Sequence, residues 1–366
     1  MVSNIEIDNR STKIFIIAYG ILLTYSLLGK IPGFGEILKN ISYVSIIIFS
    51  YLSIYNLHRV QLKQALIVIA LYICSFIIVY SSNDYSIFKL ILISSAACFV
   101  DFKKCVKFDI IFRFVLIPSV IGLCYAGIAP DEIVYTDGAE RHSLGFVNPN
   151  VMAISFFILC LDILYLCGMK ISKWNTLICL AIMYYTSSNS GSRTPVLVFC
   201  IVIICSIIYT LKPNFFFKRI IRWLIINSPI ILALITLFLT IFVMSNGIFI
   251  DIPEKYLSLF ERFQRNYTFY TQFGLSVFGN NLEIMEMSLD NFYAYSLLAL
   301  GLFGTSFYLL YLSRVLKFFF NKENFPLVLI FVCFVIYGLS EKFWMYADYN
   351  IFMITFGYIF MSKRIK

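Results

Sequence analysis

The sequence predicts an all-α protein, a polytopic transmembrane bundle of about 12 spanning helices forming one integral membrane domain over residues 1–366. Sixty per cent of the residues are hydrophobic and only 13% are charged, about half the charged share of a globular chain. Apolar runs of bilayer-spanning length recur along the whole sequence. A water-soluble fold has too little polar surface to cover so much apolar surface. We therefore exclude a soluble enzyme, a nucleic-acid-binding protein and a disordered chain.

The apolar runs define the expected helices. A spanning helix needs roughly 17–25 apolar residues, and fewer where flanking side chains reach the headgroups. Between the runs lie short polar or basic connectors, which mark the helix ends. The predicted helices cover residues 14–29, 41–57, 65–80, 86–101, 109–128, 149–168, 174–189, 194–211, 223–247, 291–312, 325–340 and 350–362.

The basic residues predict the orientation of these helices. With the N-terminus in the cytoplasm, 19 of the 29 lysines and arginines lie in inner connectors and eight in outer ones, as the positive-inside rule requires. Both termini are then cytoplasmic. The net charge of +9 reflects this orientation, so it does not indicate nucleic-acid binding.

Two outer connectors are longer than a turn, residues 129–148 and 248–290. The second lies between the ninth and tenth helices and is too aromatic and apolar for a disordered linker. Its stretches 256–263 and 269–277 are expected to form amphipathic helices at the membrane surface. None of the ten cysteines lies in an outer connector, and there is no CxxC motif. The sequence therefore predicts no disulfide framework, no metal site and no cofactor.

Arg141 and His142 lead into the first candidate site. Asn148 is expected to be the N-cap of the sixth helix, with Pro149 at its first position and Asn150 next. A helix N-terminus carries partial positive charge and unpaired N–H groups, which suit a phosphate. In the alternative interpretation Asn148 is only a cap, and Arg141 pairs with a neighbouring acidic residue, Glu140 or Asp137.

The second candidate site is the polar turn 186–195 between the seventh and eighth helices. Ser192 or Thr194 can cap the eighth helix, and Arg193 lies at the positive end of that helix. An arginine there opposes the helix dipole unless it shares an anion with the helix. Alternatively, Arg193 extends to the lipid headgroups.

The third candidate site is in the long outer connector. Arg262 and Arg265 are three residues apart, so on a helix they share one face and could grip a diphosphate. Alternatively, this helix rests on anionic lipid. Asp290 and Asn291 follow as the cap of the tenth helix, with Tyr293 two residues after Asn291. Because the even-numbered helices all begin outside, their N-termini and the four arginines can converge there.

Three further ionisable residues lie close to helix ends. Glu341 closes the eleventh helix at the outer face, where its carboxylate could deprotonate an attacking hydroxyl or pair with Lys342. Arg113 and Asp162 lie within spans near the cytoplasmic ends. We expect them to reach water or headgroups, with a proton relay as the alternative.

Three stretches in this order resemble the bacterial O-antigen and capsule polymerases (the Wzy type), relatives of the O-antigen ligases. Residues 141–150 resemble the family's Arg–Gly–Phe–Asn-Pro-Asn segment, and residues 188–195 its Ser-Gly-Ser-Arg turn. Residues 290–304 resemble the Asn-x-Tyr…Gly-x-x-Gly helix after the large outer loop. With the number of helices, the likeness covers roughly residues 14–362.

The resemblance implies a metal-independent glycosyltransferase of the bacterial plasma membrane. Such an enzyme transfers a growing glycan from one undecaprenyl diphosphate carrier onto a second lipid-linked repeat unit. Partners would be these glycans, membrane lipids, a chain-length regulator and a flippase, but no nucleic acid. The expected catalytic residues are His142, Glu341 and Asp290, and the expected substrate-binding residues are Arg141, Asn148, Asn150, Ser192, Arg193, Arg262, Arg265, Asn291 and Tyr293.

Three other functions remain open from the sequence. A lipid-linked oligosaccharide flippase or other multi-pass transporter would need polar residues deep in the spans and repeat symmetry. An O-antigen ligase is the second, although Asp290 stands where a histidine often precedes the asparagine in that branch. The third is an assembly subunit whose aromatic outer loop docks partner enzymes.

Overall fold

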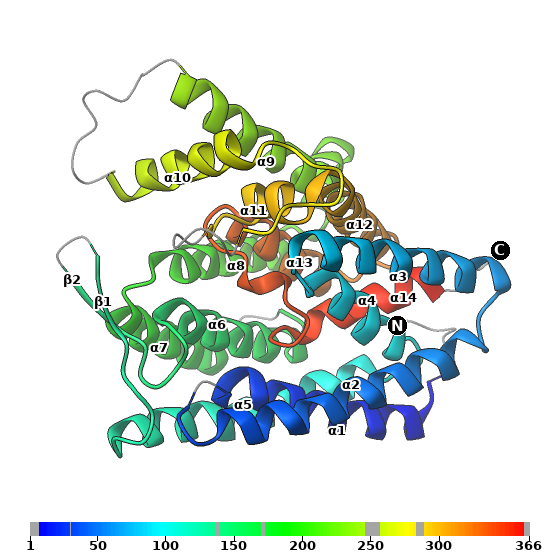
Figure 1. The fold of residues 1–366 in the computed structure, drawn as a ribbon, viewed down its shortest axis with the longest axis horizontal. Helices are drawn as coiled ribbons and strands as arrows, with labels where there is room; N and C mark the ends of the chain where they lie inside the picture. Colours follow the sequence, from blue (N-terminus) through cyan, green and yellow to red (C-terminus); the bar gives the residue numbers. More distant parts are fainter. Residues whose placement is uncertain are drawn as a thin grey trace. The chain divides into compact units, whose positions relative to one another are not determined.

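The computed structural model describes residues 7–29, 31–136, 139–169, 173–245, 257–282 and 289–361. These residues are almost entirely helical, which confirms the all-α class (Figure 1). The chain divides into two compact units. Unit 1 comprises residues 1–68, 89–213 and 343–366, and unit 2 comprises residues 69–88 and 214–342.

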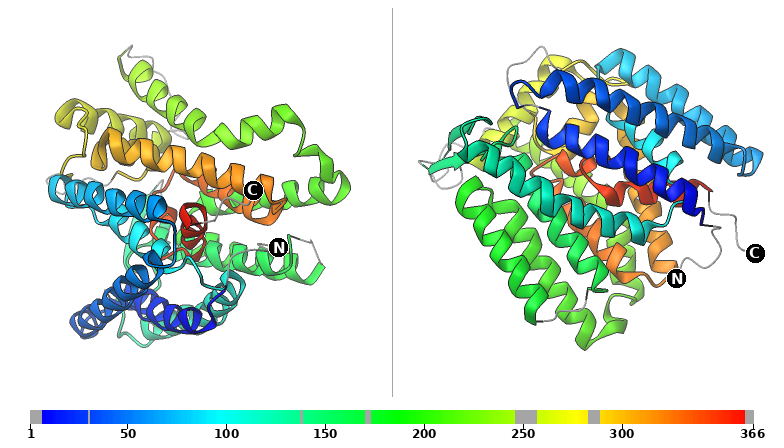
Figure 2. Two further views of the ribbon diagram at one scale, coloured as in Figure 1. Left: turned by 90° about the vertical axis from the view of Figure 1, so that its right-hand side faces the viewer. Right: turned by 90° about the horizontal axis from the view of Figure 1, so that it is seen from below.

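Unit 1 is a bundle whose long helices run side by side (Figures 1 and 2). α6 is buried along most of its length and contacts α5, α7 and α8, whereas α1 joins α2 to α5. The short 3-10 helices η3 and η4 complete the core against α6 and α5. The elements are α1 (Asn9–Leu28), α2 (Gly35–Leu57), α4 (Ser86–Ala96, mostly in this unit), α5 (Phe102–Tyr125), α6 (Pro149–Leu166), α7 (Lys173–Ser190), α8 (Arg193–Leu211), η3 (Phe343–Met345), η4 (Ile351–Ile354) and α14 (Thr355–Met361).

Unit 2 is built around α9, which contacts each of the four helices that follow it. α3 (Leu62–Ser82) begins in unit 1 and contributes most of its length to unit 2. The remaining elements are the 3-10 helix η1 (Pro213–Phe215), α9 (Arg219–Ser245), α10 (Leu257–Phe273), α11 (Phe292–Ala299), α12 (Gly301–Asn321) and α13 (Phe325–Tyr337).

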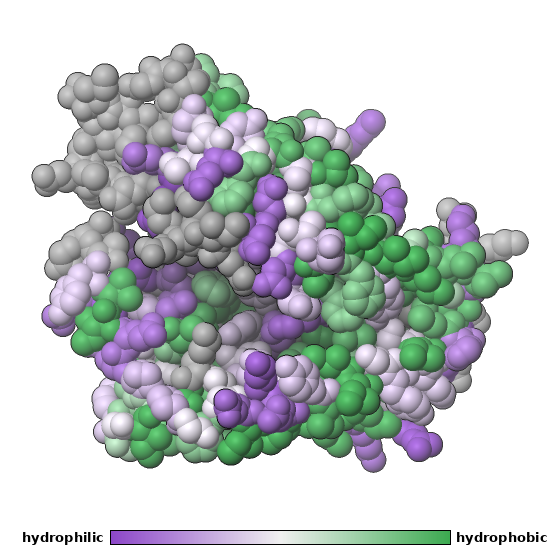
Figure 3. Space-filling model, viewed as in Figure 1, coloured by the Kyte–Doolittle hydropathy of each residue, from purple (hydrophilic) through white to green (hydrophobic). Residues whose placement is uncertain are grey.

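Seven of the described helices, α1, α2, α3, α5, α6, α8 and α9, are long and apolar enough to cross a membrane. Many of their large apolar side chains are exposed, and hydrophobic residues cover much of the face in Figure 3. Such a surface is stable in lipid and not in water. The chain is therefore a helical membrane protein, and the remaining predicted spans stay predictions.

Three predicted spans are shorter in the structure. Residues 86–101 form only the 11-residue α4, and 325–340 form the 13-residue α13. Residues 350–362 form η4 and the seven-residue α14. None of these helices alone matches the usual length of a spanning helix.

The predicted span 291–312 is wrong as one continuous helix, because the chain breaks between α11 and α12. Gly301 has φ +71°, a left-handed conformation that favours glycine. The backbone of an earlier segment fills the break: Leu302 and Phe303 donate their N–H groups to the carbonyls of Ser276 and Val277, at 3.0 Å each. The break is thus made by residues that lie about 25 positions earlier in the chain.

The two long connectors that the sequence places outside also contain structure. Residues 129–148 include an antiparallel hairpin of β1 (Ile133–Thr136) and β2 (Ala139–His142), the one sheet in the described part of the chain. In the longer connector a single helix, α10, joins the two predicted amphipathic stretches. Residues 246–256 and 283–288 of that region lie outside the described residues.

Candidate functional site

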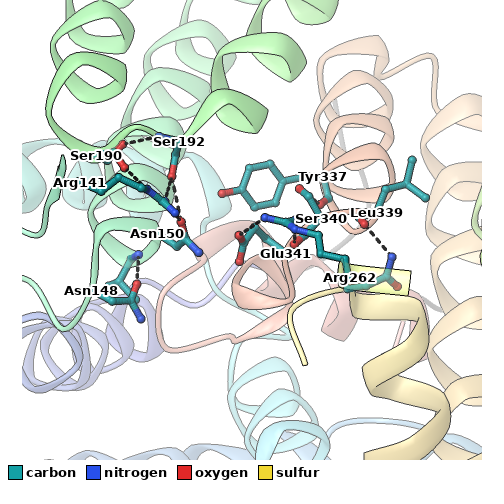
Figure 4. A network of polar contacts seen from close by, with 12 residues as sticks. Arg141, Asn148, Asn150, Ser190, Ser192, Arg262, Tyr337, Leu339, Ser340 and Glu341 are labelled. Carbon is teal, nitrogen blue, oxygen red and sulfur yellow. Dashed lines mark hydrogen bonds and ion pairs between the residues drawn. The ribbon is translucent and has the colours of Figure 1, made fainter. Parts of the chain in front are cut away.

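The guanidinium of Arg141 joins three segments of unit 1 (Figure 4). Its Nε donates to the backbone oxygen of Ser190 at 2.7 Å, and its Nη2 donates to Asn150 Oδ1 at 2.6 Å and Ser192 Oγ at 3.0 Å. The Ser192 hydroxyl donates to the same Asn150 oxygen at 2.9 Å. These neutral acceptors hold the guanidinium in one orientation. Hydrogen bonds thus unite two candidate sites that are about 40 residues apart in the sequence.

The turn before α8 is shaped around Arg141. Gly191 has φ +60°, and a Cβ at this position would lie 2.7 Å from Arg141 Cγ. Ser192 occupies the N-cap position of α8, as predicted, but its hydroxyl makes no capping hydrogen bond. That hydroxyl instead belongs to the Arg141 cluster, which we define as Arg141, Asn150, Ser190 and Ser192.

Asn148 caps α6 as the sequence predicts. Its Oδ1 accepts from the N–H of Val151 at 2.9 Å, and Pro149 is the first residue of the helix. The cap fixes the start of the helix, so that Asn150, one position further, presents its side-chain oxygen to Arg141. Asn148 therefore positions the cluster rather than belonging to it.

His142 forms a hydrogen-bonded pair with Asp131. The distance between His142 Nδ1 and Asp131 Oδ2 is 2.7 Å, and Asp131 Oδ1 also accepts from the N–H of Leu144 at 2.9 Å. An Nδ1–H donor to a carboxylate leaves Nε2 as the basic nitrogen of a neutral imidazole. Arg141 and His142 are consecutive in β2, where side chains alternate between the two faces. His142 Nε2 lies 3.9 Å from Glu140 Oε2, which shares its face.

The stability that the His142–Asp131 pair contributes depends on pH in the acidic range, through the carboxyl group of Asp131. Burial raises the pKa of Asp131, but hydrogen bonds from His142 and from the N–H of Leu144 outweigh it, so the pKa lies below the usual 3.8. The stabilisation from this carboxylate is present above pH 3.8 and is lost as pH falls through the lower folded-state pKa. We expect the difference in melting temperature between wild type and Asp131→Asn to disappear over that acidic range.

The matched control for this measurement is Glu132→Gln, which changes the exposed neighbouring carboxylate. Thermal melts of the purified chain in detergent from neutral to acidic pH provide the comparison. A difference between wild type and Asp131→Asn that persists unchanged at the lowest pH would contradict the assignment.

Arg193 is the first residue of α8, at the positive end of that helix. Its side chain is exposed, and among the described residues no hydrogen bond or ion pair to it is recorded. An exposed guanidinium at this position is consistent with both predicted roles, binding an anionic substrate and reaching the lipid headgroups.

In unit 2, Arg262 on α10 contacts the residues that follow α13 (Figure 4). Its Nη1 donates to the backbone oxygen of Ser340 at 2.9 Å, and its Nη2 lies 4.0 Å from Glu341 Oε1. Glu341 is buried and Arg262 is about one third exposed. The ion pair of Glu341 is therefore with Arg262, whereas the sequence suggested Lys342 as its partner.

Lys342 has a different environment from the one the sequence suggests. Its ammonium lies 3.8 Å from the centroid of the Tyr295 ring, in a cation–π contact. Burial lowers the pKa of Lys342, and the negative charges of Asp290, Asp84 and Glu341 partly offset this effect. Asp290 thus lies within electrostatic range of Lys342. Arg265, three residues after Arg262, is half-buried on α10.

Asn291 and Tyr293 fasten α11 to the end of α13. Asn291 caps α11 through the N–H of Ala294 at 2.9 Å and donates to the carbonyl of Leu339 at 2.7 Å. The buried Tyr293 hydroxyl donates to the carbonyl of Val335 at 2.7 Å. These polar groups form hydrogen bonds inside the protein, so Asn291 and Tyr293 hold the chain segment around Glu341 in place.

An apolar cavity of about 170 Å³ lies among the helices of unit 2. It is lined almost entirely by apolar surface from α9, α10, α11 and α12. α10 contributes Asn266 and Tyr270 to the lining, and Arg262 lies one turn before Asn266 on the same helix. Helix α10 therefore contains Arg262 and also lines an apolar cavity.

The predicted site residues are divided between the two units. The structure brings Arg141, Asn150 and Ser192 together, and separately Arg262 and Glu341. Convergence of all four arginines stays a prediction. Unit 1 holds Arg141, His142, Asn148, Asn150, Ser192 and Arg193, whereas unit 2 holds Arg262, Arg265, Asp290, Asn291, Tyr293 and Glu341.

Asp131 and the backbone of Ser190 are parts of the site that sequence reasoning missed. Asp131 is 11 residues from His142 and meets it only because the chain turns back through the hairpin. The strands have four residues each, so the pattern of hydrophobic residues carried little signal for them.

Comparisons of the chain with protein-family models, with curated proteins and with solved structures found no match.

Proposed function

We propose that this chain polymerises undecaprenyl-diphosphate-linked oligosaccharide repeat units at the outer face of the bacterial plasma membrane. The observation that carries the proposal is the Arg141 cluster, in which two segments that resemble motifs of the O-antigen and capsule polymerases hold one guanidinium. A preorganised cation at a helix N-terminus suits the diphosphate of a lipid-linked sugar. The predicted orientation, with both termini cytoplasmic and 12 spans, belongs to this proposal.

In the proposed reaction a hydroxyl of the acceptor repeat unit attacks the anomeric carbon of the donor glycan. The bond between that carbon and the diphosphate oxygen breaks, and the departing undecaprenyl diphosphate keeps the electron pair. His142 Nε2 takes the hydroxyl proton, and Asp131 stabilises the imidazolium that forms, as in other carboxylate–histidine pairs. Arg141, with Arg193 beside the same turn, offsets the charge on the leaving group. The reaction balances without a metal ion or a cofactor.

Unit 2 supports a lipid-linked substrate in two ways. In this proposal Arg262 and Arg265 on α10 contact a second phosphate group or glycan hydroxyls, and Glu341 orients Arg262. The apolar cavity beside α10 can take a stretch of polyprenyl chain. Asp290, Asn291 and Tyr293 then act by positioning. A chain-length regulator and a flippase would be the partners of such a polymerase.

A lipid-linked oligosaccharide flippase is the second candidate, and one observation favours it. Arg113, Asp109 and Asp162 are fully buried within α5 and α6, so the expectation that Arg113 and Asp162 reach water or headgroups is wrong. Buried charges inside spans are typical of transporters. The polymerase remains the stronger candidate because the Arg141 cluster lies at helix ends, with Asn150 in the first turn of α6 and Ser192 just before α8.

The test is a chain-length assay in cells whose own copy of the gene is deleted. Arg141→Lys keeps the charge but loses the planar fork that bonds Ser190, Asn150 and Ser192. Losing such a charged hydrogen bond costs about 1.5–3 kcal/mol, or roughly tenfold to a hundredfold in rate. We expect single repeat units to accumulate on the lipid carrier at the cell surface.

The matched control is Arg219→Lys, which changes the exposed first residue of α9 and should give full-length polymer. Each variant must be present at the wild-type level. Full-length polymer from Arg141→Lys would contradict the role of Arg141. Accumulation of lipid-linked units on the cytoplasmic side in the deletion strain would instead identify a flippase.

A further inference from the structure

Four polar side chains meet inside unit 1, between α1, α5 and α6. They are Tyr19 on α1, Asp109 and Arg113 on α5, and Asp162 on α6, and none is more than 1% exposed. Arg113 Nε donates to Asp109 Oδ2 at 2.9 Å. Arg113 Nη2 donates to the backbone carbonyl of Tyr349 in the segment before η4.

Asp162 has no such partner. Neither of its carboxyl oxygens has a hydrogen-bond partner among the described residues, and the same holds for Asp109 Oδ1 and Tyr19 Oη. The neighbours of Asp162 are Asp109 and Arg113, and Tyr19 faces the same three charged residues. Buried polar atoms are almost always hydrogen-bonded. The group of unpartnered oxygens therefore indicates that a further species, a proton or a cation, lies among these side chains.

The net charge of Asp109, Asp162 and Arg113 indicates which species this is. Two ionised carboxylates beside one guanidinium would leave one buried negative charge uncompensated, which is far costlier than leaving a neutral polar group buried. The other titratable neighbours are the thiols of Cys105, beside Asp109, and Cys160, beside Asp162, which are neutral when protonated. One added positive charge restores neutrality. A metal cation would lie against the Arg113 guanidinium and be repelled by it, whereas a proton would not.

We propose that Asp109 and Asp162 bind one proton between them, which makes this cluster a proton-binding site in the interior of unit 1. The proton resides on Asp162, whose O–H donates to Asp109 Oδ1, and it is taken from water. The remaining negative charge on Asp109 is paired with Arg113, so the whole cluster is neutral. The hydrogen bond also ties α6 to α5.

The proposal gives the stability of the protein a direction with pH. The folded chain holds a proton that an exposed aspartate would have released, so it binds one proton more than the unfolded chain at neutral pH. Stability contributed by this site is therefore full below the ordinary aspartate pKa of 3.8 and falls as pH rises above it, until the folded chain also releases the proton. Asp162→Asn has the shape and the neutral charge of the protonated acid, and it cannot titrate.

Infrared spectroscopy of the full chain in lipid nanodiscs tests the proposal directly. At neutral pH we expect the carbonyl band of a protonated carboxyl group, shifted when water is exchanged for D2O. Asp162→Asn should lose this band, whereas Glu36→Gln, which changes an exposed carboxylate of α2, should retain it. A wild-type spectrum without the band, or an unchanged band in Asp162→Asn, would overturn the proposal.

Thermal melts of the same samples distinguish a proton from a metal cation. Asp162→Asn should melt at the wild-type temperature at acidic pH, where an exposed aspartate is also protonated, and should lack the decline that the wild type shows as pH rises. Asp109→Asn, which leaves Arg113 without its ion-pair partner, should melt lower. A melting temperature of the wild type that rises with sodium or potassium at constant ionic strength, but not in Asp162→Asn, would assign the site to a cation. Failure of Asp162→Asn to fold would also contradict a neutral Asp162.

Discussion

Replacing His142 by alanine should reduce glycan transfer by roughly 10²–10⁴-fold, the usual contribution of a general base. The variant removes Nε2, which takes the proton of the acceptor hydroxyl in the proposed reaction, and leaves the Arg141 hydrogen bonds in place. Substrate binding should therefore change little. The measurement is the rate of polymer formation by the purified chain in liposomes that contain the lipid-linked repeat units of the source cells.

The chain offers a matched control, because its second histidine, His58, is exposed after α2. His58→Ala should transfer glycan at the wild-type rate. Added imidazole should partly restore His142→Ala, since the small base can occupy the space of the lost ring, and it should not affect His58→Ala. Polymer formed at the wild-type rate by His142→Ala would exclude His142 as the general base and would make Glu341 the next candidate for that role.

Gly301→Ala should cause a large loss of stability in unit 2. A Cβ on Gly301 would lie 2.3 Å from the Gly279 nitrogen and 2.6 Å from the Val277 carbonyl oxygen. These neighbours are backbone atoms, so they cannot rotate away as a side chain would. The left-handed φ adds about 1–2 kcal/mol, and we expect a total of about 3–5 kcal/mol. The loss is measured as a lowered melting temperature of the purified chain.

Gly127→Ala separates the two contributions. Gly127 has a similar φ of +73°, but a Cβ there would have no atom within 4 Å. This variant should lose only the cost of the backbone conformation, about 1–2 kcal/mol. If the two alanine variants melt at the same temperature, the close approach of residues 276–280 to the break between α11 and α12 is not maintained in solution.

Local sequence signals predicted those features whose causes lie within a few residues. The cap at Asn148 with Pro149 after it needs only its own helix, and the amphipathic pattern of α10 is likewise read from consecutive residues. The seven long spans also follow from composition alone. In each case the determining interaction is with the neighbouring chain or with the solvent.

Features that depend on distant residues were not predicted. The helix break at Gly301 is formed by the backbone of Ser276 and Val277, and hydropathy does not report which segment will approach a glycine. The same holds for Arg113 and Asp162, whose burial depends on which side of each helix faces the protein. Hydropathy measures how apolar a span is, but it cannot distinguish the side that meets lipid from the side that meets another helix.

The division of the chain has a consequence for biosynthesis. The polypeptide passes between the two units after residues 68, 88, 213 and 342. During translation unit 1 therefore lacks Trp344 and the buried residues of η4 until residues 214–342 of unit 2 have been made. The ribosome and the translocon must release the chain through η4 before this core can close. A nascent chain that stops before residue 343 should be a substrate for membrane quality-control proteases, although most of its helices are already inserted.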